Sequence, residues 1–303
     1  MAYSTSAGSL DVIENAQMAA KVDTIVLVPI GGLCNRLRAI ISALALARDC
    51  HAALDIVWLR NQELNARYSD LFQALNLPAE RSGITVRIVE STSWLRYGVV
   101  RKRNLWLPSW YQRHAFDVRL TDDIISAILS APHSDAELAA EIRHRLHGRV
   151  LIQTGSTFYP SEKHWLKQLF RPSAAVEGLL QQRLSMITPQ TVGLHIRQTD
   201  NTQSILHSPL SAFEAAMRKD LERDPATTFY VATDNPSLLP VLSARFPIHY
   251  STTAPTRTSV RGMQEALAEL WTLMACPRFH GSYWSSFSDF VVEEGPDGDI
   301  VRG

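Results

Sequence analysis

Apolar residues near the start of the chain follow two different spacings, which predict a strand, a helix and a second strand. The run 24–30 is short, apolar and rich in β-branched residues, as is typical of a buried parallel strand. Gly31-Gly-Leu-Cys-Asn35 interrupts it. Apolar side chains then recur at helical spacing over 37–47, and 54–58 is the next predicted strand. This order of elements is a βαβ unit.

The same alternation restarts in the second half of the chain. The pattern predicts strands over 190–196, 228–232 and 248–250, and helices over 209–221, 236–244 and 262–275. A charged helix is predicted over 175–186, after a crossing segment that ends at Pro172. Residues 93–125 are rich in Trp, Arg and Tyr without a clear period, so no element is predicted there.

These two series predict an α/β protein with two doubly wound halves that face a crevice. We place an N-terminal domain at 22–172 and a C-terminal domain at 173–303. Residues 1–21 are rich in Ser and Ala and lack a charged segment followed by an apolar one. We therefore expect a disordered leader there rather than a signal peptide.

Composition narrows the class of protein. The chain has 303 residues, of which 46% are hydrophobic and 20% charged, as in ordinary folded proteins. Its 30 basic and 30 acidic residues cancel, so there is no cationic excess for nucleic acid. No apolar run approaches the ~20 residues that cross a bilayer. The three cysteines are odd in number and lack metal-ligand spacing, so we expect no disulfide framework, no zinc site and a reducing, cytoplasmic location.

Candidate chemistry begins at the first glycine turn. Gly31 and Gly32 let the backbone approach a ligand closely, and Asn35 lies where the helix starts. Free N–H groups at a helix start favour an anion. The segment has neither the Gly-Lys-Ser/Thr of a P-loop nor a dinucleotide fingerprint. A plain tight turn is the alternative interpretation.

A second candidate lies at the end of the strand over 190–196. Alternation along a strand puts His195 and Arg197 on the same face. An arginine at a strand's carboxyl end can bind a diphosphate through two donors and stabilise charge on a leaving group. The alternative is an ordinary salt bridge between Arg197 and Asp200.

Polar residues follow other predicted strands as well. Asp234 either caps the next helix or contacts a ligand. Ser285, Ser286 and Ser288 either bind phosphate or cap a helix. Asp297-Gly-Asp299 is similar to the Asp-x-Asp of metal-dependent glycosyltransferases, but its place near the C-terminus beside a proline favours a surface turn. We therefore predict no metal site.

Four segments in order resemble the inverting fucosyltransferase superfamily, which includes the α1,6-fucosyltransferases, the bacterial nodulation-factor fucosyltransferases and the protein O-fucosyltransferases. They are Gly31-Gly-Leu-Cys-Asn35, Gly193-Leu-His-Ile-Arg-Gln-Thr-Asp200, Phe229-Tyr-Val-Ala-Thr-Asp-Asn-Pro-Ser-Leu-Leu239, and Leu267-Ala-Glu-Leu-Trp-Thr-Leu273 followed by Trp284-Ser-Ser-Phe-Ser288. The resemblance covers roughly 22–290. It implies a GT-B-type glycosyltransferase with two Rossmann-like domains.

The resemblance also implies a GDP-sugar donor, most simply GDP-fucose, and a saccharide or glycoconjugate acceptor. The donor-binding residues that it implies are Gly31, Gly32, Asn35, His195, Arg197, Asp234, Glu269, Ser285, Ser286, Phe287 and Ser288. His195 and Arg197 would contact the diphosphate, with the serine loop on its other side and with Asp234 and Glu269 near the nucleoside. No metal cofactor is expected, because arginine and helix-end amides neutralise the leaving group.

The sequence departs from the family at three places. Gln198 stands where the family has a second arginine, and Asn235 replaces a second aspartate. The α1,6 enzymes carry a glutamate base shortly after the arginine motif, whereas 204–206 here is Ser-Ile-Leu. Asp200 is therefore the candidate base, with orientation of Arg197 as its other possible duty.

Two other functions stay open at this point. One keeps the fold and uses another GDP-linked deoxyhexose. A second is a nucleotide-sugar-binding protein without turnover, which the missing arginine and glutamate would allow. A dinucleotide-dependent oxidoreductase is disfavoured, because neither half carries Gly-x-Gly-x-x-Gly after its first strand. The sequence does not identify the acceptor.

Overall fold

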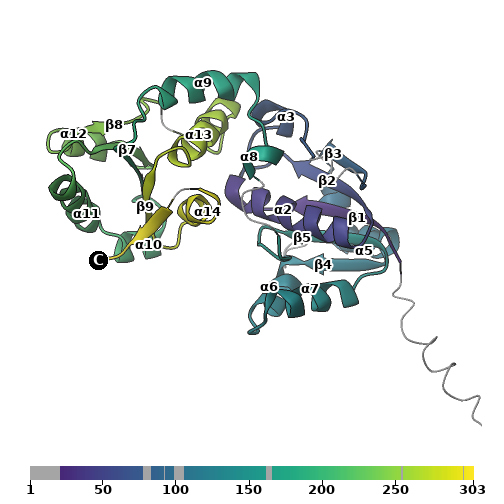
Figure 1. The fold of residues 1–303 in the computed structure, drawn as a ribbon. Coiled ribbons are helices and arrows are strands. Elements are labelled where there is room, and N and C mark those ends of the chain that lie inside the picture. Colours follow the sequence, from purple (N-terminus) through teal and green to yellow (C-terminus); the bar gives the residue numbers. More distant parts are fainter. Residues whose placement is uncertain are drawn as a thin grey trace, which may run out of the picture.

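The computed structural model consists of two α/β halves, each built around one parallel sheet (Figure 1). It describes residues 21–77, 83–91, 93–98, 106–161, 166–253, 255–295 and 297–303. The expected leader, apart from Lys21, lies outside these residues. Within the described part of the chain, no helix is both long and apolar enough to cross a membrane.

The N-terminal sheet has the strand order β3-β2-β1-β5-β4, and its paired strands are all parallel. Its strands are β1 (Val22–Pro29), β2 (Ala53–Leu59), β3 (Val86–Ser91), β4 (Val118–Thr121) and β5 (Gly148–Thr154). Its helices are α2 (Leu33–Asp49), α3 (Tyr68–Leu71), α4 (Trp94–Tyr97), α5 (Trp106–Ala115), α6 (Asp122–Leu129) and α7 (Asp135–His144). The central strand β1 is almost wholly buried, which explains its continuous apolar sequence.

The C-terminal sheet has the order β10-β9-β6-β7-β8 and is also parallel throughout. Its strands are β6 (Thr191–Ile196), β7 (Thr228–Thr233), β8 (Ile248–His249), β9 (Arg278–Ser282) and β10 (Asp297–Val301). The helices of this part of the chain are α8 (Leu166–Leu169), α9 (Ala174–Leu184), α10 (Thr202–His207), α11 (Leu210–Arg223), α12 (Leu238–Ser243), α13 (Val260–Leu273) and α14 (Ser286–Glu294). Strand β6 is central and buried at every residue.

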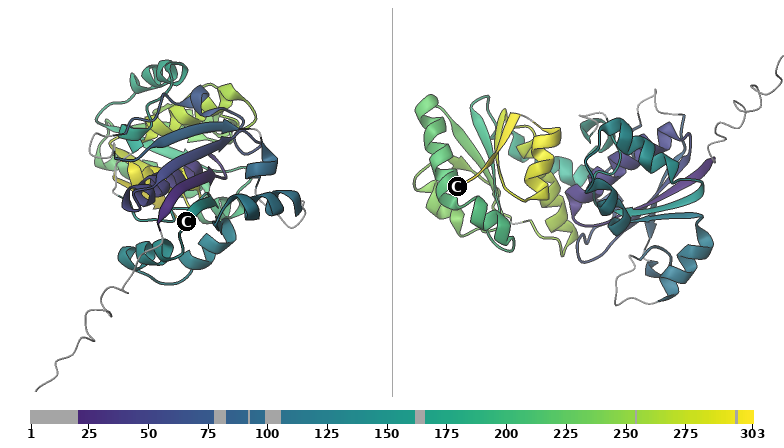
Figure 2. Two further views of the ribbon diagram at one scale, coloured as in Figure 1. Left: turned by 90° about the vertical axis from the view of Figure 1, so that its right-hand side faces the viewer. Right: turned by 90° about the horizontal axis from the view of Figure 1, so that it is seen from below.

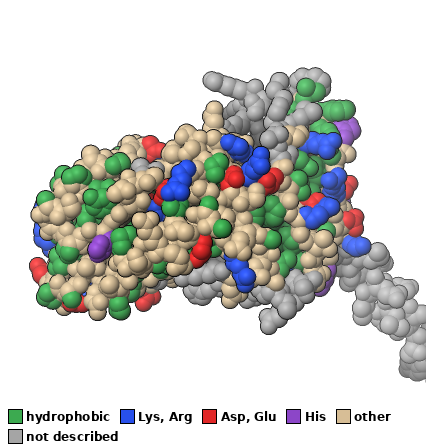
Figure 3. Space-filling view, turned by 90° about the horizontal axis from the view of Figure 1, so that it is seen from above, with side chains coloured by type: hydrophobic (Ala, Val, Ile, Leu, Met, Phe, Trp, Pro, Cys, Tyr) green, Lys and Arg blue, Asp and Glu red, His purple; other side chains and the backbone are tan. Residues whose placement is uncertain are grey.

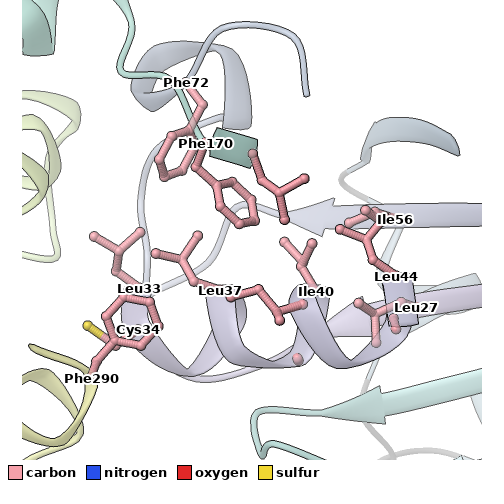
Figure 4. Packing of buried hydrophobic residues seen from close by; sticks show 14 of the residues in the cluster. Leu27, Leu33, Cys34, Leu37, Ile40, Leu44, Ile56, Phe72, Phe170 and Phe290 are labelled. Carbon is pink, nitrogen blue, oxygen red and sulfur yellow. The ribbon is translucent and has the colours of Figure 1, made fainter. Parts of the chain in front are cut away.

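One hydrophobic cluster runs from the N-terminal sheet into the C-terminal half. In Figure 4, Leu44 of α2 lies beside the strand residues Leu27 and Ile56. Leu37, nearer the start of the helix, lies on the side of Phe170, and Phe290 of α14 reaches Cys34. Figure 2 shows the two halves from two further directions, with the α2 side of one half next to the α14 side of the other. The two halves therefore share part of their core.

Aromatic and ionic contacts add to this junction. The Phe72 ring lies 5.4 Å from Phe170 and 6.4 Å from Trp271 of α13, measured between ring centroids. Arg38 of α2 donates to Glu293 of α14 at 2.7 Å. The two halves therefore contact each other through buried apolar side chains as well as through this ion pair. An exposed ion pair alone would add little stability to the junction.

The predicted α/β class with two sheets is confirmed, but several elements were missed. Residues 93–125 contain α4, α5 and β4 and the start of α6, because an irregular mixture of aromatic and basic residues still buries Gln112 and Leu120. Strands β3 and β5 were also not predicted. The prediction of a surface turn at Asp297–Asp299 is wrong. These residues start β10, which pairs in parallel with β9 and packs Gly298 against Phe279.

Candidate functional site

A cavity of about 570 Å³ lies where the carboxyl end of the C-terminal sheet meets the start of α2. Its walls come from the ends of β6 and β7, the loop 255–257, helix α13, the turn before α14 and residues 32–34. In a parallel sheet all these strand ends lie at one edge, so residues far apart in sequence converge there. The position agrees with the crevice that the sequence predicted.

The space-filling view shows how charged side chains are distributed over one face of the molecule. On the described part of the face in Figure 3, Lys and Arg side chains are interspersed with Asp and Glu side chains rather than gathered in one broad basic area. This agrees with a formal net charge of zero. The charges that matter for a ligand are therefore those inside the cavity.

Arg197, directly after β6, is held in the cavity wall by two carboxylates. Its Nε lies 3.1 Å from Asp234 Oδ2, and its Nη2 donates to Asp200. Asp234 also accepts from the backbone N–H of Gln198 at 2.7 Å and from the Thr199 hydroxyl. The predicted Arg197–Asp200 salt bridge thus exists, and it coexists with a position in which the guanidinium lines the cavity.

His195 is a neutral, fixed side chain of the same wall. Its ring stacks on Phe287 with centroids 4.6 Å apart, and its Nδ1 lies 2.7 Å from Ser288 Oγ. Because Ser288 Oγ already accepts from the Ser282 N–H, its hydroxyl proton is free to go to Nδ1, which leaves the ring proton on Nε2. Burial and the nearby Arg197 lower the pKa of His195 to about 4. At neutral pH the ring can therefore offer one uncharged N–H donor.

The first turn of α14 supplies further donors. Ser285 is the N-cap, and no side chain caps the helix. The first N–H groups of a helix have no partner inside it and attract anions. Ser285, Ser286 and Phe287 all line the cavity, on a wall that also carries Arg197. Together they form a cradle for a negatively charged group.

Glu269 of α13 provides a buried carboxyl at another part of the wall. Its side chain has no hydrogen-bond partner among the described residues, and only 5% of the residue is exposed. Burial raises the pKa of Glu269 to about 8, against the opposing effect of Arg183. A second cavity of about 200 Å³ adjoins it and is lined by residues 250–252 after β8. Glu269 therefore lines both cavities, and its carboxyl group is protonated at neutral pH in the absence of a ligand.

The N-terminal half contributes a rigid glycine turn. Gly31 has φ +81°, and a Cβ there would lie 2.9 Å from Asn35 Nδ2, so glycine is required. Gly32 is the N-cap of α2 and lines the cavity. The buried Arg36 fixes the turn by donating to the Gly31 carbonyl at 2.9 Å and to Asn61 at the same distance. Sequence reasoning missed Arg36, because nothing in its spacing indicates burial.

The structure brings most of the predicted site residues to one cavity. Those that line it are Gly32, His195, Arg197, Asp234, Glu269, Ser285, Ser286 and Phe287. The others lie next to it: Gly31 and Asn35 shape the turn, Ser288 holds His195, and Asp200 pairs with Arg197.

Three lining residues with charged or aromatic side chains were not predicted. Arg257, on the loop after β8, forms no ion pair with any acid in the described residues and offers a second cation. Trp284 and Asp289 flank the serine loop. Trp284 is the first residue of the segment 284–288 that resembles the fucosyltransferases, and nothing else in the sequence indicates a role for it. Arg257 and Asp289 reach the cavity through tertiary packing alone.

Comparison with known proteins gives matches in structure only. No protein-family model matches the chain, and no curated protein matches its sequence. The structure of NodZ alpha-1,6-fucosyltransferase soaked with GDP-fucose is 14% identical, with a TM-score of 0.57 over 89% of this chain and 91% of that chain. POFUT1 in complex with GDP is 12% identical, with a TM-score of 0.52 over 92% of this chain and 97% of that chain.

The fold is therefore similar to that of the GT-B-like fucosyltransferases, and the resemblance seen in the sequence is confirmed at the level of the fold. Among them, the fucosyltransferase NodZ from Bradyrhizobium is 15% identical, with a TM-score of 0.57 over 89% of this chain and 93% of that chain. Identity this low shows the fold alone. Function must be argued from the residues of the cavity.

Glu269 should make the protein less stable as the pH rises from about 5 to 8. Its pKa is near 4.5 when unfolded and about 8 when folded, so in this range the folded chain binds the extra proton and rising pH favours unfolding. The loss is on the order of 4 kcal/mol at most. Urea unfolding at pH 5.5 and 8.5 measures it, and Glu269→Gln should remove it. The exposed Glu222→Gln is the control; the same pH dependence in Glu269→Gln and wild type would contradict the assignment.

Proposed function

We propose that the protein is a glycosyltransferase that moves fucose, or a closely related sugar, from its GDP donor to a saccharide hydroxyl, with inversion and without a metal cofactor. The observation that carries this proposal is the single cavity in which Arg197, the start of α14 and Glu269 lie together. The C-terminal half, 173–303, binds the donor, and the N-terminal half, 22–172, faces the acceptor.

The nucleoside belongs at the Glu269 end of the cavity. Guanine presents two neighbouring N–H donors on one edge, which the two oxygens of a single carboxylate can accept, so Glu269 would bind guanine in its deprotonated form. Adenine and uracil do not present this pair. The adjoining cavity after β8 offers room for the base. Asp234 was the other candidate for this role, but its oxygens are engaged by Arg197, Gln198 and Thr199, which favours Glu269.

The diphosphate belongs in the middle of the cavity. Arg197 presents a planar guanidinium, the first turn of α14 presents backbone N–H groups, and neutral His195 presents a ring N–H. Gln198 stands at the place of the second arginine in the family's motif. Arg257, which also lines the cavity, supplies a second cation instead. These groups stabilise the charge that develops on GDP as the glycosidic bond breaks, which is the task a metal performs in other glycosyltransferases.

GDP and GDP-fucose should stabilise the protein much more than UDP or ADP. A ligand that binds only the folded chain adds about 2.7 kcal/mol at 100 times its Kd. A thermal-shift series with GDP, GDP-fucose, UDP and ADP measures this preference. Glu269→Gln should lose most of the discrimination between GDP and UDP, whereas the exposed Glu222→Gln should keep it. An equal shift with UDP in the wild type would refute guanine recognition.

Transfer from GDP-fucose should persist after treatment with EDTA. The expectation rests on the positive charge and N–H donors of Arg197, Arg257 and α14, which already serve the diphosphate. Release of GDP is measured before and after chelation, and again after Mn²⁺ or Mg²⁺ is added. Loss of activity in EDTA that either ion restores would refute metal independence.

Arg197→Lys should lower kcat by on the order of 10²–10³, or roughly 3–4 kcal/mol, because lysine keeps the charge but loses the planar pair of donors. The bond to phosphate strengthens in the transition state, so kcat falls as well as donor affinity. Turnover, GDP affinity and melting temperature are measured for this variant. If Arg197 only pairs with Asp200, Arg197→Lys keeps its turnover, and Asp200→Asn destabilises the protein as much as Arg197→Ala does.

A further inference from the structure

The order of strands gives the cavity a direction. Because β6 lies between β9 and β7, the loops after β9 and β7 flank Arg197 on opposite sides. The proposed nucleoside end lies on the β7 and β8 side, with Glu269, and the diphosphate lies at Arg197. The sugar of the donor, and the acceptor beyond it, therefore fall on the β9 side. The wall there carries Trp284 and Asp289.

The turn before α14 keeps the indole ring of Trp284 exposed to solvent. It is 65% exposed although it lines the cavity, and its φ is +54°, a conformation that a bulky residue rarely adopts. Neighbouring groups fix the turn: Asn201 Nδ2 donates to the Trp284 carbonyl at 2.7 Å, and the Ser204 hydroxyl donates to the Tyr283 carbonyl at 2.6 Å. Residues of α10 and of the segment before it thus stabilise an unfavourable backbone conformation at Trp284, in which the indole ring lies at the cavity wall.

A flat, exposed indole is suited to a sugar ring. One face of a hexopyranose consists largely of C–H groups, which pack on an aromatic surface, while the hydroxyls at its edge stay free for polar partners. Saccharide sites use aromatic walls in this way because the ring combines apolar area with a fixed geometry. Because Trp284 lines the cavity and is largely exposed, its ring is accessible to a ligand there.

Asp289 is the carboxylate of this wall that has no partner. Its side chain, in the first turn of α14, forms no hydrogen bond or ion pair with the described residues and lines the cavity. Burial raises its pKa, against the effect of the nearby Arg38. Asp200, the base expected from the sequence, is paired with Arg197 and does not line the cavity. Asp289 is therefore better placed to take a proton.

We propose that Trp284 and Asp289 form the acceptor subsite, in which Trp284 stacks on a hexopyranose ring and Asp289 is the general base. The inference rests on the proposed function. The acceptor oxygen bonds to the anomeric carbon of the donor sugar as the bond from that carbon to the β-phosphate oxygen breaks. The acceptor proton passes to an Asp289 carboxylate oxygen, and the electron pair of the broken bond leaves with GDP.

The base is tested without knowing the acceptor, because water can replace it. GDP-fucose hydrolysis, followed as GDP release, should fall about 10²-fold or more in Asp289→Asn, whereas GDP affinity stays within twofold of wild type. Asp289→Glu should recover part of the rate, and the exposed Asp297→Asn should have the wild-type rate. If Asp289 only stabilises the start of α14, Asp289→Asn lowers the melting temperature and keeps the rate, which would overturn the proposal.

The stacking surface is tested by ¹⁵N-tryptophan NMR with GDP present and with triacetylchitotriose and cellotriose as probes. The Trp284 indole signal, identified by its absence in Trp284→Phe, should shift with saccharide. Trp284→Gly should bind the probes at least tenfold more weakly with unchanged GDP affinity. Glycine accepts a φ of +54°, so this variant should fold at least as well as wild type. Leu206→Ala, at an equally exposed apolar residue outside the cavity wall, is the control.

An indole signal that neither saccharide moves, in a protein that binds GDP, would overturn the stacking role and leave the proposed function intact. A wild-type rate of hydrolysis in Asp289→Asn would overturn Asp289 as the base. A wild-type protein that does not bind GDP, or that binds GDP but never releases it from GDP-fucose, would refute the proposed function instead. Failure of the further inference and failure of the proposed function therefore give different results.

Discussion

The parallel pairing of β6 with β9 on one side and β7 on the other is the constraint on which the site depends. It places the residues that follow these three strands along one edge, in a fixed order. Arg197, Asp234 and Trp284 are neighbours there although up to 87 residues separate them in the chain. The start of α2 then closes this edge from the other half, where α2 and α14 share a buried cluster. The cavity is thus a consequence of topology and of the core between the halves.

Two charged groups of the cavity are compensated in different ways in the absence of a ligand. Arg197 is paired with Asp200 and Asp234, and Glu269 carries a proton at neutral pH because its surroundings disfavour the charged form. A diphosphate that reaches Arg197 must compete with these carboxylates, of which Asp200 is the more exposed, at 65% of its side chain. We therefore expect Asp234 to keep orienting the guanidinium while Asp200 yields to the ligand. The orientation of Arg197 is then fixed before the ligand binds, and only the exposed contact with Asp200 has to break on binding.

Sequence patterns predicted the parts of the fold in which each strand and helix has its own apolar period. They predicted β1, β6, β7 and the helices beside them, and the same-face placement of His195 and Arg197. They missed β5, whose short apolar core over 150–152 lies between polar residues, and the irregular elements after residue 93. Arg257 and Asp289 were missed for a different reason. Their places in the cavity follow from how loops and helices pack, which no local period encodes.

The donor and acceptor sides of the cavity differ in how strongly chemistry constrains them. In the proposed donor site a guanidinium, helix-end amides and a carboxyl group bind GDP, and all three lie in segments that resemble known fucosyltransferases even though the aligned structures are only 12–15% identical. An acceptor requires only a surface that fits its own shape and a group that takes one proton. In our proposal Trp284 and Asp289 meet that need from the turn and the helix start that also carry the serines of the proposed phosphate site. One short segment of the chain would then contribute to both the donor side and the acceptor side of the cavity.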